Sequence, residues 1–205
     1  MFRFLFSRRW IGLGLFVAFM AISSWFLGNW QLDRWEARKE SNQRAAVQLE
    51  KAPVPLSQIE SADGKIAGKH HWANIQLIGT FRSDVNIVVR YIKRDSSPGV
   101  EIVTPFDTVD GQTVLVNRGW MKTANTGDRP EEIPAAPGGE VTISGWWKPD
   151  AVGDRGTSID ADSVRAIDSS QWTKRLGTEA VPGYIALQQP KTEGLTPLDP
   201  PELGN

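Results

Sequence analysis

The feature that most constrains this chain of 205 residues is an uncharged apolar run near its N-terminus. Residues 10–32, WIGLGLFVAFMAISSWFLGNWQL, contain no Asp, Glu, Lys or Arg. As a helix rising about 1.5 Å per residue, the run would be about 34 Å long, enough to cross the ~30 Å hydrocarbon core of a bilayer. Trp10 and Trp30 bracket it, about 30 Å apart, where indole rings favour the two headgroup regions. The sequence therefore predicts a transmembrane helix over residues 10–32.

A cleaved signal peptide is the alternative interpretation of the same segment. Residues 1–9 form a basic tail with three arginines, and residues 21–23 resemble a cleavage site. The apolar run is longer than the ~7 to 15 residues of a typical signal peptide, and the helical pattern continues past Trp30, so we favour an uncleaved anchor. Basic residues are equally frequent on both sides of the run. The short tail places the N-terminus in the cytoplasm, with everything from Ser41 onward outside it.

The rest of the chain changes its pattern at three points. Residues 33–52 lack Pro and Gly and are rich in helix formers, which predicts a juxtamembrane helix, and residues 53–70 begin with two prolines and predict a linker. Residues 71–189 alternate β-branched and aromatic runs with turn residues. Residues 190–205 contain four prolines and no core pattern, which predicts an extended exit segment.

The segment 71–189 therefore predicts a β-rich domain. Asp110-Gly111 is a strong hairpin signal, because this turn needs positive φ. Residues 160–177 have the spacing of one amphipathic helix or two short ones, with Val164, Ile167, Trp172 and Leu176 on the buried side. We expect a mainly antiparallel α+β domain, barrel-like or a sandwich, with one or two short helices behind the N-terminal transmembrane helix.

Composition and motifs argue against several classes of function. The chain has 23 basic and 24 acidic residues, and no block of one sign in its second half indicates a nucleic-acid partner. It has no cysteine, which removes disulfides, thiolate metal sites and a cysteine nucleophile. His70 and His71 are adjacent, so in a strand they would point to opposite faces and could not share a metal. No hydrolase, zinc-protease or nucleotide-binding motif occurs. We therefore expect no catalytic residue, no metal site and no enzymatic activity.

The stretch TVLVNRGW at residues 113–120 is where an apolar run meets a cation and a large aromatic. If no bulge intervenes, alternation places Val114, Val116, Arg118 and Trp120 on one face of a strand. In one interpretation Arg118 is a solvated strand end stacked on Trp120. In the other, Arg118, Gly119 and Trp120 form a rim that meets a partner or an acidic group.

Four segments of the chain together resemble a known family. They are LGNWQLDRWEARK after the apolar run, GTF at 79–81, PGVEIVTPFDTVDGQTVLVNRGWM at 98–121 and SGWWKP at 144–149. In this order and spacing, behind a membrane helix, they resemble the surfeit locus family of cytochrome oxidase assembly proteins. The most specific parts are the pattern G-x-W-Q-x-x-R and the block that runs from T-P-F to V-L-V-N-R-G-W.

The resemblance implies a function and a location. It implies an assembly factor in a bacterial inner membrane, with its main domain in the periplasm, that helps subunit I of a haem–copper cytochrome c oxidase to mature, by delivering or inserting haem A. The implied partners are subunit I, other oxidase assembly factors and membrane lipid, with no nucleic acid. Two alternatives remain: a membrane-tethered β-domain that scaffolds another envelope complex, and an envelope enzyme.

The resemblance also implies a second transmembrane helix, which opens with a histidine-containing motif linked to haem. This sequence stops at Asn205, so we expect a truncated chain without that helix, and His70 and His71 do not match the motif. The candidate rim for a haem propionate or an oxidase loop, which arginine would bind through paired hydrogen bonds, comprises Trp30, Gln31 and Arg34 at the outer end of the helix and Arg118, Gly119 and Trp120 in the β-domain.

Overall fold

The computed structural model describes residues 8–62, 64–151, 158–160, 162–201 and 203. The chain divides into two compact units, Met1–Arg44 with Leu203–Asn205, and Ala45–Glu202. The first unit holds most of one long helix, and the second holds the β-sheet.

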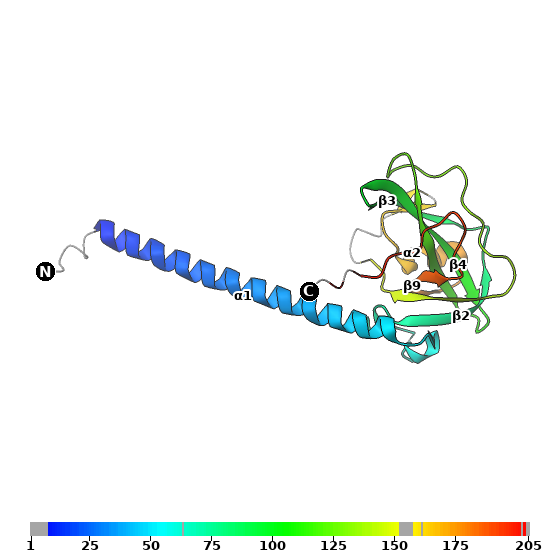
Figure 1. The fold of residues 1–205 in the computed structure, drawn as a ribbon, viewed down its shortest axis with the longest axis horizontal. Helices are drawn as coiled ribbons and strands as arrows, with labels where there is room; N and C mark the ends of the chain where they lie inside the picture. Colours follow the sequence, from blue (N-terminus) through cyan, green and yellow to red (C-terminus); the bar gives the residue numbers. More distant parts are fainter. Residues whose placement is uncertain (1–7, 63, 152–157, 161, 202, 204–205) are drawn as a thin grey trace. The chain divides into compact units, whose positions relative to one another are not determined.

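The helix α1 (Arg8–Glu50) runs without a break through both segments that the sequence predicts as helical (Figure 1). The first proline of the chain is Pro53, and a proline disfavours helical geometry in the residue before it, which accounts for where α1 ends. Large apolar side chains of its first half are exposed, Phe19 by 65% for example. In the described part of the chain, this helix is long and apolar enough to cross a membrane. The predicted apolar helix is thus confirmed, and a bilayer would cover its side chains.

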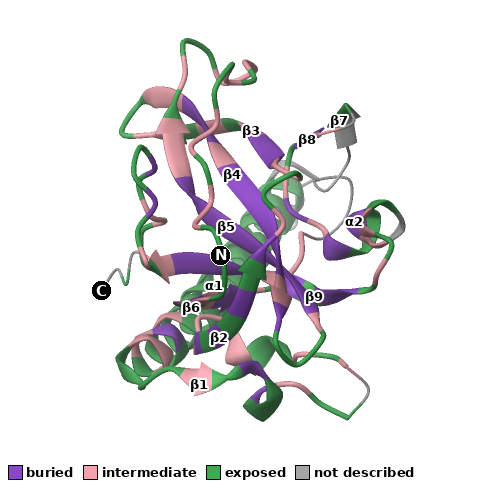
Figure 2. Ribbon diagram, turned by 90° about the vertical axis from the view of Figure 1, so that its right-hand side faces the viewer, coloured by how far each residue is buried: buried purple, intermediate pink, exposed green. Residues whose placement is uncertain are grey.

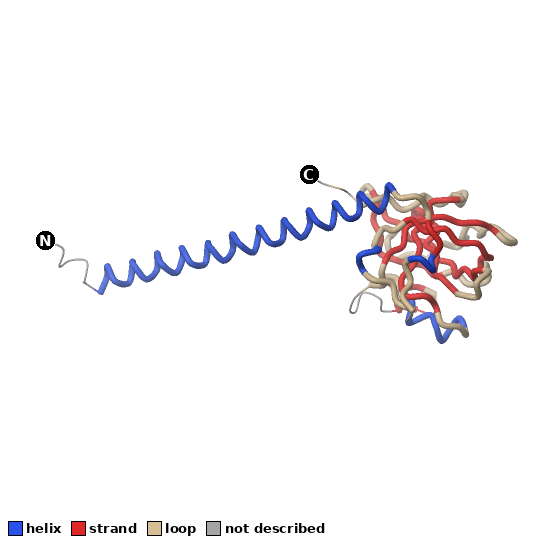
Figure 3. The backbone as a smooth tube through the Cα atoms, turned by 90° about the horizontal axis from the view of Figure 1, so that it is seen from below, coloured by secondary structure: helices blue, strands red, loops and turns tan. Residues whose placement is uncertain are grey.

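The second unit is built mainly of strands (Figure 3). Their order in the sheet is β1-β2-β6-β9-β5-β4-β3-β8-β7. The bounds are β1 (Val54–Pro55), β2 (Asn74–Phe81), β3 (Ile87–Arg94), β4 (Ser97–Thr108), β5 (Thr113–Lys122), β6 (Val141–Lys148), β7 (Ser158–Asp160), β8 (Ser163–Val164) and β9 (Ala180–Gln189). Two short 3₁₀ helices, η2 (Leu56–Gln58) and η3 (Gly68–His70), lie with β1 in the segment predicted as a linker.

The sheet is mixed. Strands β1 and β2, β3 and β8, and β5 and β9 pair in parallel, whereas the remaining neighbours are antiparallel. An additional short pairing joins residues 79–81 of β2 to residues 106–108 of β4. The prediction of a mainly antiparallel β-domain with few helices is confirmed, but the sheet is not a closed barrel.

The hairpin between β4 and β5 forms at the predicted dipeptide. Gly111 has a φ of 82°, and its N–H donates to the Thr108 carbonyl at 3.0 Å. A residue with a Cβ adopts this φ only with strain, so glycine is the residue that lets the chain turn here.

The helix expected over residues 160–177 is shorter than the sequence pattern indicated. Its first part instead contains the short strands β7 and β8, and Val164 lies in β8, which pairs with β3. The helix α2 (Ser169–Leu176) begins only after Asp168, whose side chain accepts a hydrogen bond from the N–H of Ser170 at 3.1 Å. This cap and the left-handed Gly177 at the other end fix the length of α2.

Three apolar clusters form the core. Figure 2 shows the buried residues, in purple, concentrated in the central strands of the sheet. The largest joins β2, β4, β5, β6 and β9 around Phe106, Val116 and Ile185. A second packs α2 against the sheet through Trp172 and Leu115. The third contains Val88, Val100, Ile102 and, from beyond the last strand, Leu195.

Leu195 belongs to the third cluster although the sequence of residues 190–205 shows no core pattern. Leu195 is only 8% exposed, and Thr196 exchanges two 2.8 Å backbone hydrogen bonds with Trp120 of β5. We call residues 192–199 the strap. The strap lies against β5, so part of the expected exit segment is packed onto the domain.

Candidate functional site

A β-bulge interrupts the pairing of β4 with β5 in the middle of the stretch TVLVNRGW. Ile102 faces Gly119 and Val103 faces Asn117, so Arg118 is the extra residue of β5. Arg118 contacts Thr104, which faces Val116, so Arg118 stays on the Val116 side of β5 as alternation predicts. Trp120 faces Glu101, which is hydrogen-bonded to Asn117, so the bulge moves Trp120 to the opposite side. The prediction of one face for all four residues held only if no bulge intervened, and the bulge removes that condition.

Arg118 is buried, with 1% of its surface exposed, and β5 continues past it to Lys122. The interpretation of Arg118 as a solvated strand end is therefore wrong. Its Nε donates to Thr104 Oγ1 at 2.9 Å and its Nη2 to Asn86 Oδ1 at 3.1 Å, while Nη1 has no hydrogen-bond acceptor in the described part of the chain. Burial lowers the pKa of Arg118 to about 10, and the side chain remains a cation at neutral pH.

Gly119 lies where the strap crosses β5. Its φ is 135°, and a Cβ built on it would lie 2.6 Å from the carbonyl oxygen of Thr196. A side chain at this position would therefore strain the backbone and also push the strap away. Gly119 is a requirement of the local packing rather than a surface available to a partner.

Asn117 joins the two sides of the bulge. Its Oδ1 accepts a hydrogen bond from the N–H of Gly119 at 3.1 Å, and its Nδ2 donates to Glu101 Oε2 at 2.7 Å. The side chain thus replaces ladder bonds that the bulge disrupts and also holds a carboxylate of the neighbouring strand. In the sequence Asn-Arg-Gly, each residue therefore has a different structural role: Asn117 bonds across the bulge, Arg118 is buried and hydrogen-bonded, and Gly119 leaves room for the strap.

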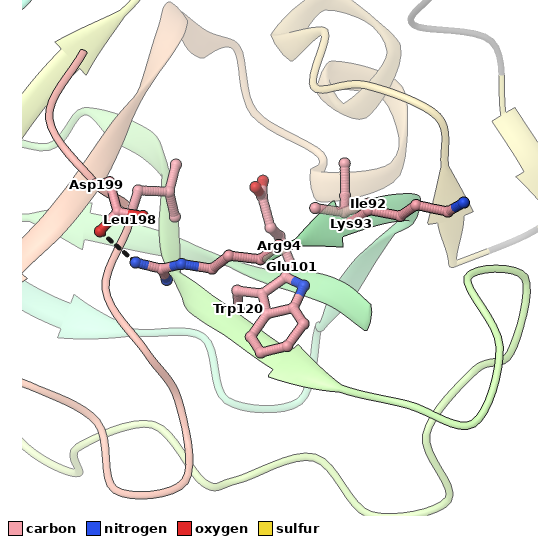
Figure 4. A pocket seen from close by; sticks show the side chains of 7 residues that line it. All are labelled: Ile92, Lys93, Arg94, Glu101, Trp120, Leu198 and Asp199. Carbon is pink, nitrogen blue, oxygen red and sulfur yellow. Dashed lines mark hydrogen bonds and ion pairs between the residues drawn. The ribbon is translucent and has the colours of Figure 1, made fainter. Parts of the chain in front are cut away.

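Trp120 is the member of the stretch that faces an open space. Its indole ring packs directly over Gly99, where a Cβ would come within 2.2 Å of the ring. The ring forms one wall of a pocket of about 230 Å³ (Figure 4). The pocket lies between Ile92, Lys93 and Arg94 of β3, Glu101 of β4, Trp120 of β5, and Leu198 and Asp199 of the strap.

The charges in this pocket are unequally paired. Arg94 donates from Nη1 to the Pro197 carbonyl at 2.8 Å and forms an ion pair with Asp199 through Nη2 (Figure 4). Glu101 accepts the hydrogen bond from Asn117 and has no ion pair in the described residues. Burial raises the pKa of the Glu101 carboxyl, and the Asn117 hydrogen bond with the more distant charges of Lys148 and Arg94 offsets only part of that rise.

Lys148 lies near this carboxylate but is held by aromatic rings. Its Nζ is 4.9 Å from the centroid of the Trp72 ring and 5.7 Å from that of Tyr184. Burial lowers the pKa of Lys148, against the opposing effect of Glu101. Burial, with the charge of Glu101, also raises the pKa of the Tyr184 hydroxyl. Perturbed ionisable groups beside a pocket are typical of functional sites, so we take the pocket as the candidate site.

The structure therefore divides the residues of the predicted rim. Arg118 and Gly119 are buried, and Trp120 lines the pocket. Trp30, Gln31 and Arg34 are exposed on α1, where the Arg34 guanidinium lies 5.5 Å from the centroid of the Trp30 ring. The combination of these two sets in one rim stays a prediction.

Sequence reasoning missed Glu101, Arg94 and Asp199. A signal for Glu101 was present, because an acidic residue inside the apolar strand GVEIV has to be accommodated either at a surface or in a site. Arg94 and Asp199 are 105 positions apart and carry no local pattern that would pair them.

Among the described residues, the two histidines belong to no group of three or more potential metal ligands. His70 ends η3 and His71 follows it, so neither lies in a strand. The His71 ring stacks on Trp72, with the centroids 4.9 Å apart, and its Nε2 is buried with no hydrogen-bond partner among the residues that the structure describes. Burial and neighbouring lysines lower the pKa of both histidines.

Comparison with known proteins shows where this fold and its motifs belong. The family model described as the SURF1 family matches residues 18–203. An uncharacterized SURF1-like protein of Mycobacterium tuberculosis is 27% identical, over 98% of this chain and 75% of its own length. A SURF1-like protein of Dictyostelium discoideum is 30% identical over 61% of this chain and 47% of its own. The cytochrome oxidase assembly protein SHY1 of Saccharomyces cerevisiae is 30% identical over 54% of this chain and 28% of its own. The chain belongs to the SURF1 family.

Proposed function

We propose that this protein is an assembly factor for a haem–copper cytochrome c oxidase, and not an enzyme. The observation that carries the proposal is membership of the SURF1 family together with the similarity to a yeast protein named as a cytochrome oxidase assembly protein. In the finer form of the proposal, the protein helps subunit I to mature, in contact with other assembly factors, and takes part in delivering or inserting haem A.

The proposal places the protein in the inner membrane of a bacterium, with the N-terminus in the cytoplasm and the β-domain in the periplasm. An uncharged apolar helix and a short basic tail support this arrangement. Reporter fusions at the N-terminus and at Gly111, which lies in an exposed turn, test it. A fusion at Gly111 that is active in the cytoplasm, or a mature chain that starts near Ser24, would contradict it.

The pocket at Trp120 and the side chain of His71 do not fit a haem site. His71 Nε2 is covered by neighbouring atoms, and the pocket at Trp120 has a volume of about 230 Å³, below the roughly 300–1,000 Å³ of typical ligand pockets. Within the proposal, the β-domain acts by contact with a protein.

Deletion of the gene tests the proposed function. Membranes of the deletion strain should have lower haem a absorbance and lower oxidase activity, and a plasmid copy of the gene should restore both. Succinate dehydrogenase activity in the same membranes is the control for general damage to the envelope. Normal haem a and normal oxidase activity would contradict the proposal and favour a scaffold for another envelope complex.

A further inference from the structure

We propose that the pocket at Glu101 and Trp120 binds a cationic side chain, an arginine or a lysine, presented by an extended segment of a partner protein. The proposal concerns a binding site that family membership does not assign, and it does not depend on the oxidase as the partner. It rests on a carboxylate with no counter-ion among the described residues, an aromatic wall, apolar side walls and an open cavity.

The first observation is the state of the Glu101 carboxylate. It is half-buried, its Oε2 accepts one hydrogen bond from Asn117, and no lysine or arginine of the described chain lies within ion-pair distance of it. A carboxylate that has lost part of its hydration is costly unless a cation or several donors replace the water. In Figure 4 the carboxylate stands free of the other side chains drawn. The chain thus leaves room for a cation from elsewhere.

The other charges of the pocket do not fill this role. Arg94 is already engaged with Asp199 and with the Pro197 carbonyl. The amine of Lys93 points away from Glu101 in Figure 4. Lys148 is held over the rings of Trp72 and Tyr184 and contributes only a longer-range field. The pairing of Arg94 with Asp199 also satisfies the positive group that would otherwise attract an anion.

The walls of the pocket favour a long cationic side chain over a bare ion. The Trp120 ring offers a face of the kind that attracts guanidinium and ammonium groups, and Ile92 and Leu198 offer apolar contact to an alkyl stem. A volume of about 230 Å³ holds a group of side-chain size, since one water needs only about 10–15 Å³ of such space.

One further group favours a protein segment over a free amine. The indole Nε1 of Trp120 is buried without an acceptor in the described part of the chain, and buried donors of folded proteins are nearly always paired. Gly99 lies against this N–H, so a backbone carbonyl of an incoming segment would reach it once the ring turns toward the pocket. A soluble polyamine has no acceptor to offer.

Titration of the full chain in detergent micelles tests the proposal, with the indole resonances of its nine tryptophans as the readout. The Trp120 resonance is assigned as the one that disappears in Trp120→Phe. Blocked Ala-Arg-Ala and Ala-Lys-Ala peptides should shift it saturably, with a dissociation constant in the millimolar range expected for a single anchor, and added salt should weaken binding. The same peptide with citrulline in place of arginine has the shape without the charge and should cause no saturable shift.

Glu101→Gln is the decisive variant, because glutamine keeps an acceptor for Asn117 and removes only the charge. It should weaken binding of the arginine peptide at least tenfold, whereas Glu140→Gln, at an exposed carboxylate before β6, should leave binding unchanged. The tryptophan resonances other than Trp120 report whether the variant is folded. Equal binding of the citrulline peptide, or no effect of Glu101→Gln, would overturn the proposal.

Two further probes distinguish other occupants. Tighter binding of spermidine than of the arginine peptide would assign the pocket to a soluble amine instead. Tighter binding of a blocked Ala-Glu-Ala peptide would show that Arg94 releases Asp199 and that the site is one for anions. Either result would overturn the assignment to a cationic side chain.

Discussion

A charged side chain lies on each side of the bulge in β5, and the two are buried to different extents. On one side Arg118 is almost fully covered, with hydrogen bonds to Thr104 and Asn86. On the other side Glu101 is half-buried, held by Asn117 and open to a cavity. Burial of either charge carries a desolvation cost, but only beside Glu101 does a cavity leave room for another group. A buried charge that is fully enclosed therefore has a structural role. A buried charge that borders a cavity is a candidate for binding.

Truncation of Arg118 should have the largest effect on stability. Arg118→Ala would leave a cavity and remove a partner from both Thr104 and Asn86, with an expected loss of roughly 2–5 kcal/mol in the free energy of unfolding. Arg118→Glu should cost more, because it buries an anion there, and Arg118→Met should cost less, because it retains most of the stem. Chemical denaturation of the full chain in detergent measures all three. Wild-type stability for Arg118→Ala would show that the cation is exposed in solution.

Gly119→Ala should have the next largest effect, because it strains a φ of 135° and pushes on the carbonyl of Thr196. We expect a loss of about 1–3 kcal/mol, and faster proteolysis of the strap. Gly111→Ala is the matched control, since its φ is also positive but no atom lies within 4 Å of a Cβ there. It should cost only about 1 kcal/mol and leave the strap protected. Equal strap cleavage in the two variants would mean that Gly119 does not hold the strap in place.

Glu101→Gln should stabilise the protein at neutral pH, by about 0.5–2 kcal/mol, as removal of a functional charge commonly does. The sign follows from the raised pKa of this carboxyl: the folded state binds the proton more tightly, so parent stability falls as pH rises above the unfolded value of about 4.3. The advantage of the variant should therefore be present at pH 7 and disappear below about pH 4. Unfolding curves at both pH values measure it, and a destabilised variant at pH 7 would show that Glu101 is already well paired.

The ion pair of Arg82 with Asp107 gives the smallest effect and the opposite sign. Arg82 Nε lies 2.5 Å from Asp107 Oδ2 near the surface. Burial acts to raise the pKa of Asp107, but the hydrogen bonds from Arg82 and Thr113 outweigh it and the net pKa is lowered. The stabilisation is thus present above about pH 4 and is lost as pH falls through the folded pKa. Asp107→Asn should cost at most about 1 kcal/mol at pH 7 and nothing at low pH, and a cost that persists at low pH would contradict an electrostatic origin.

Local pattern sufficed for the elements whose causes are local. The absence of charge between Trp10 and Leu32 predicts the apolar part of α1, and the turn chemistry of Asp110-Gly111 predicts the hairpin. The bulge escaped prediction because it depends on the register between β4 and β5, which no pattern within either strand encodes. Alternation placed Val114 and Val116 correctly in the core, but it put Trp120 on their face, whereas beyond the bulge Trp120 pairs with Glu101 on the Asn117 side.

The strap escaped prediction for a related reason. Its single buried leucine, Leu195, lies among prolines and polar residues, so the segment shows no periodic pattern of apolar residues. The candidate site could not be predicted for both of these reasons. One of its walls comes from the strap, and Glu101 is held by Asn117 at the bulge. Its strongest sequence signal was Glu101 in an apolar strand, and that signal gives no hint of a cavity.

The bridge between Thr196 and Trp120 allows the opening of the strap side of the pocket to be followed by hydrogen exchange. The bridge consists of two backbone hydrogen bonds, and the strap residues Leu198 and Asp199 lie just beyond it. When the strap frays, both amides become open to exchange with deuterium while the rest of β5 stays protected by β4. The exchange rates of Thr196 and Trp120 therefore measure how often the pocket loses two of its walls. A ligand that needs all the walls must slow both amides together, by the same factor at each concentration, and would leave the amide of Val116 in the core unchanged.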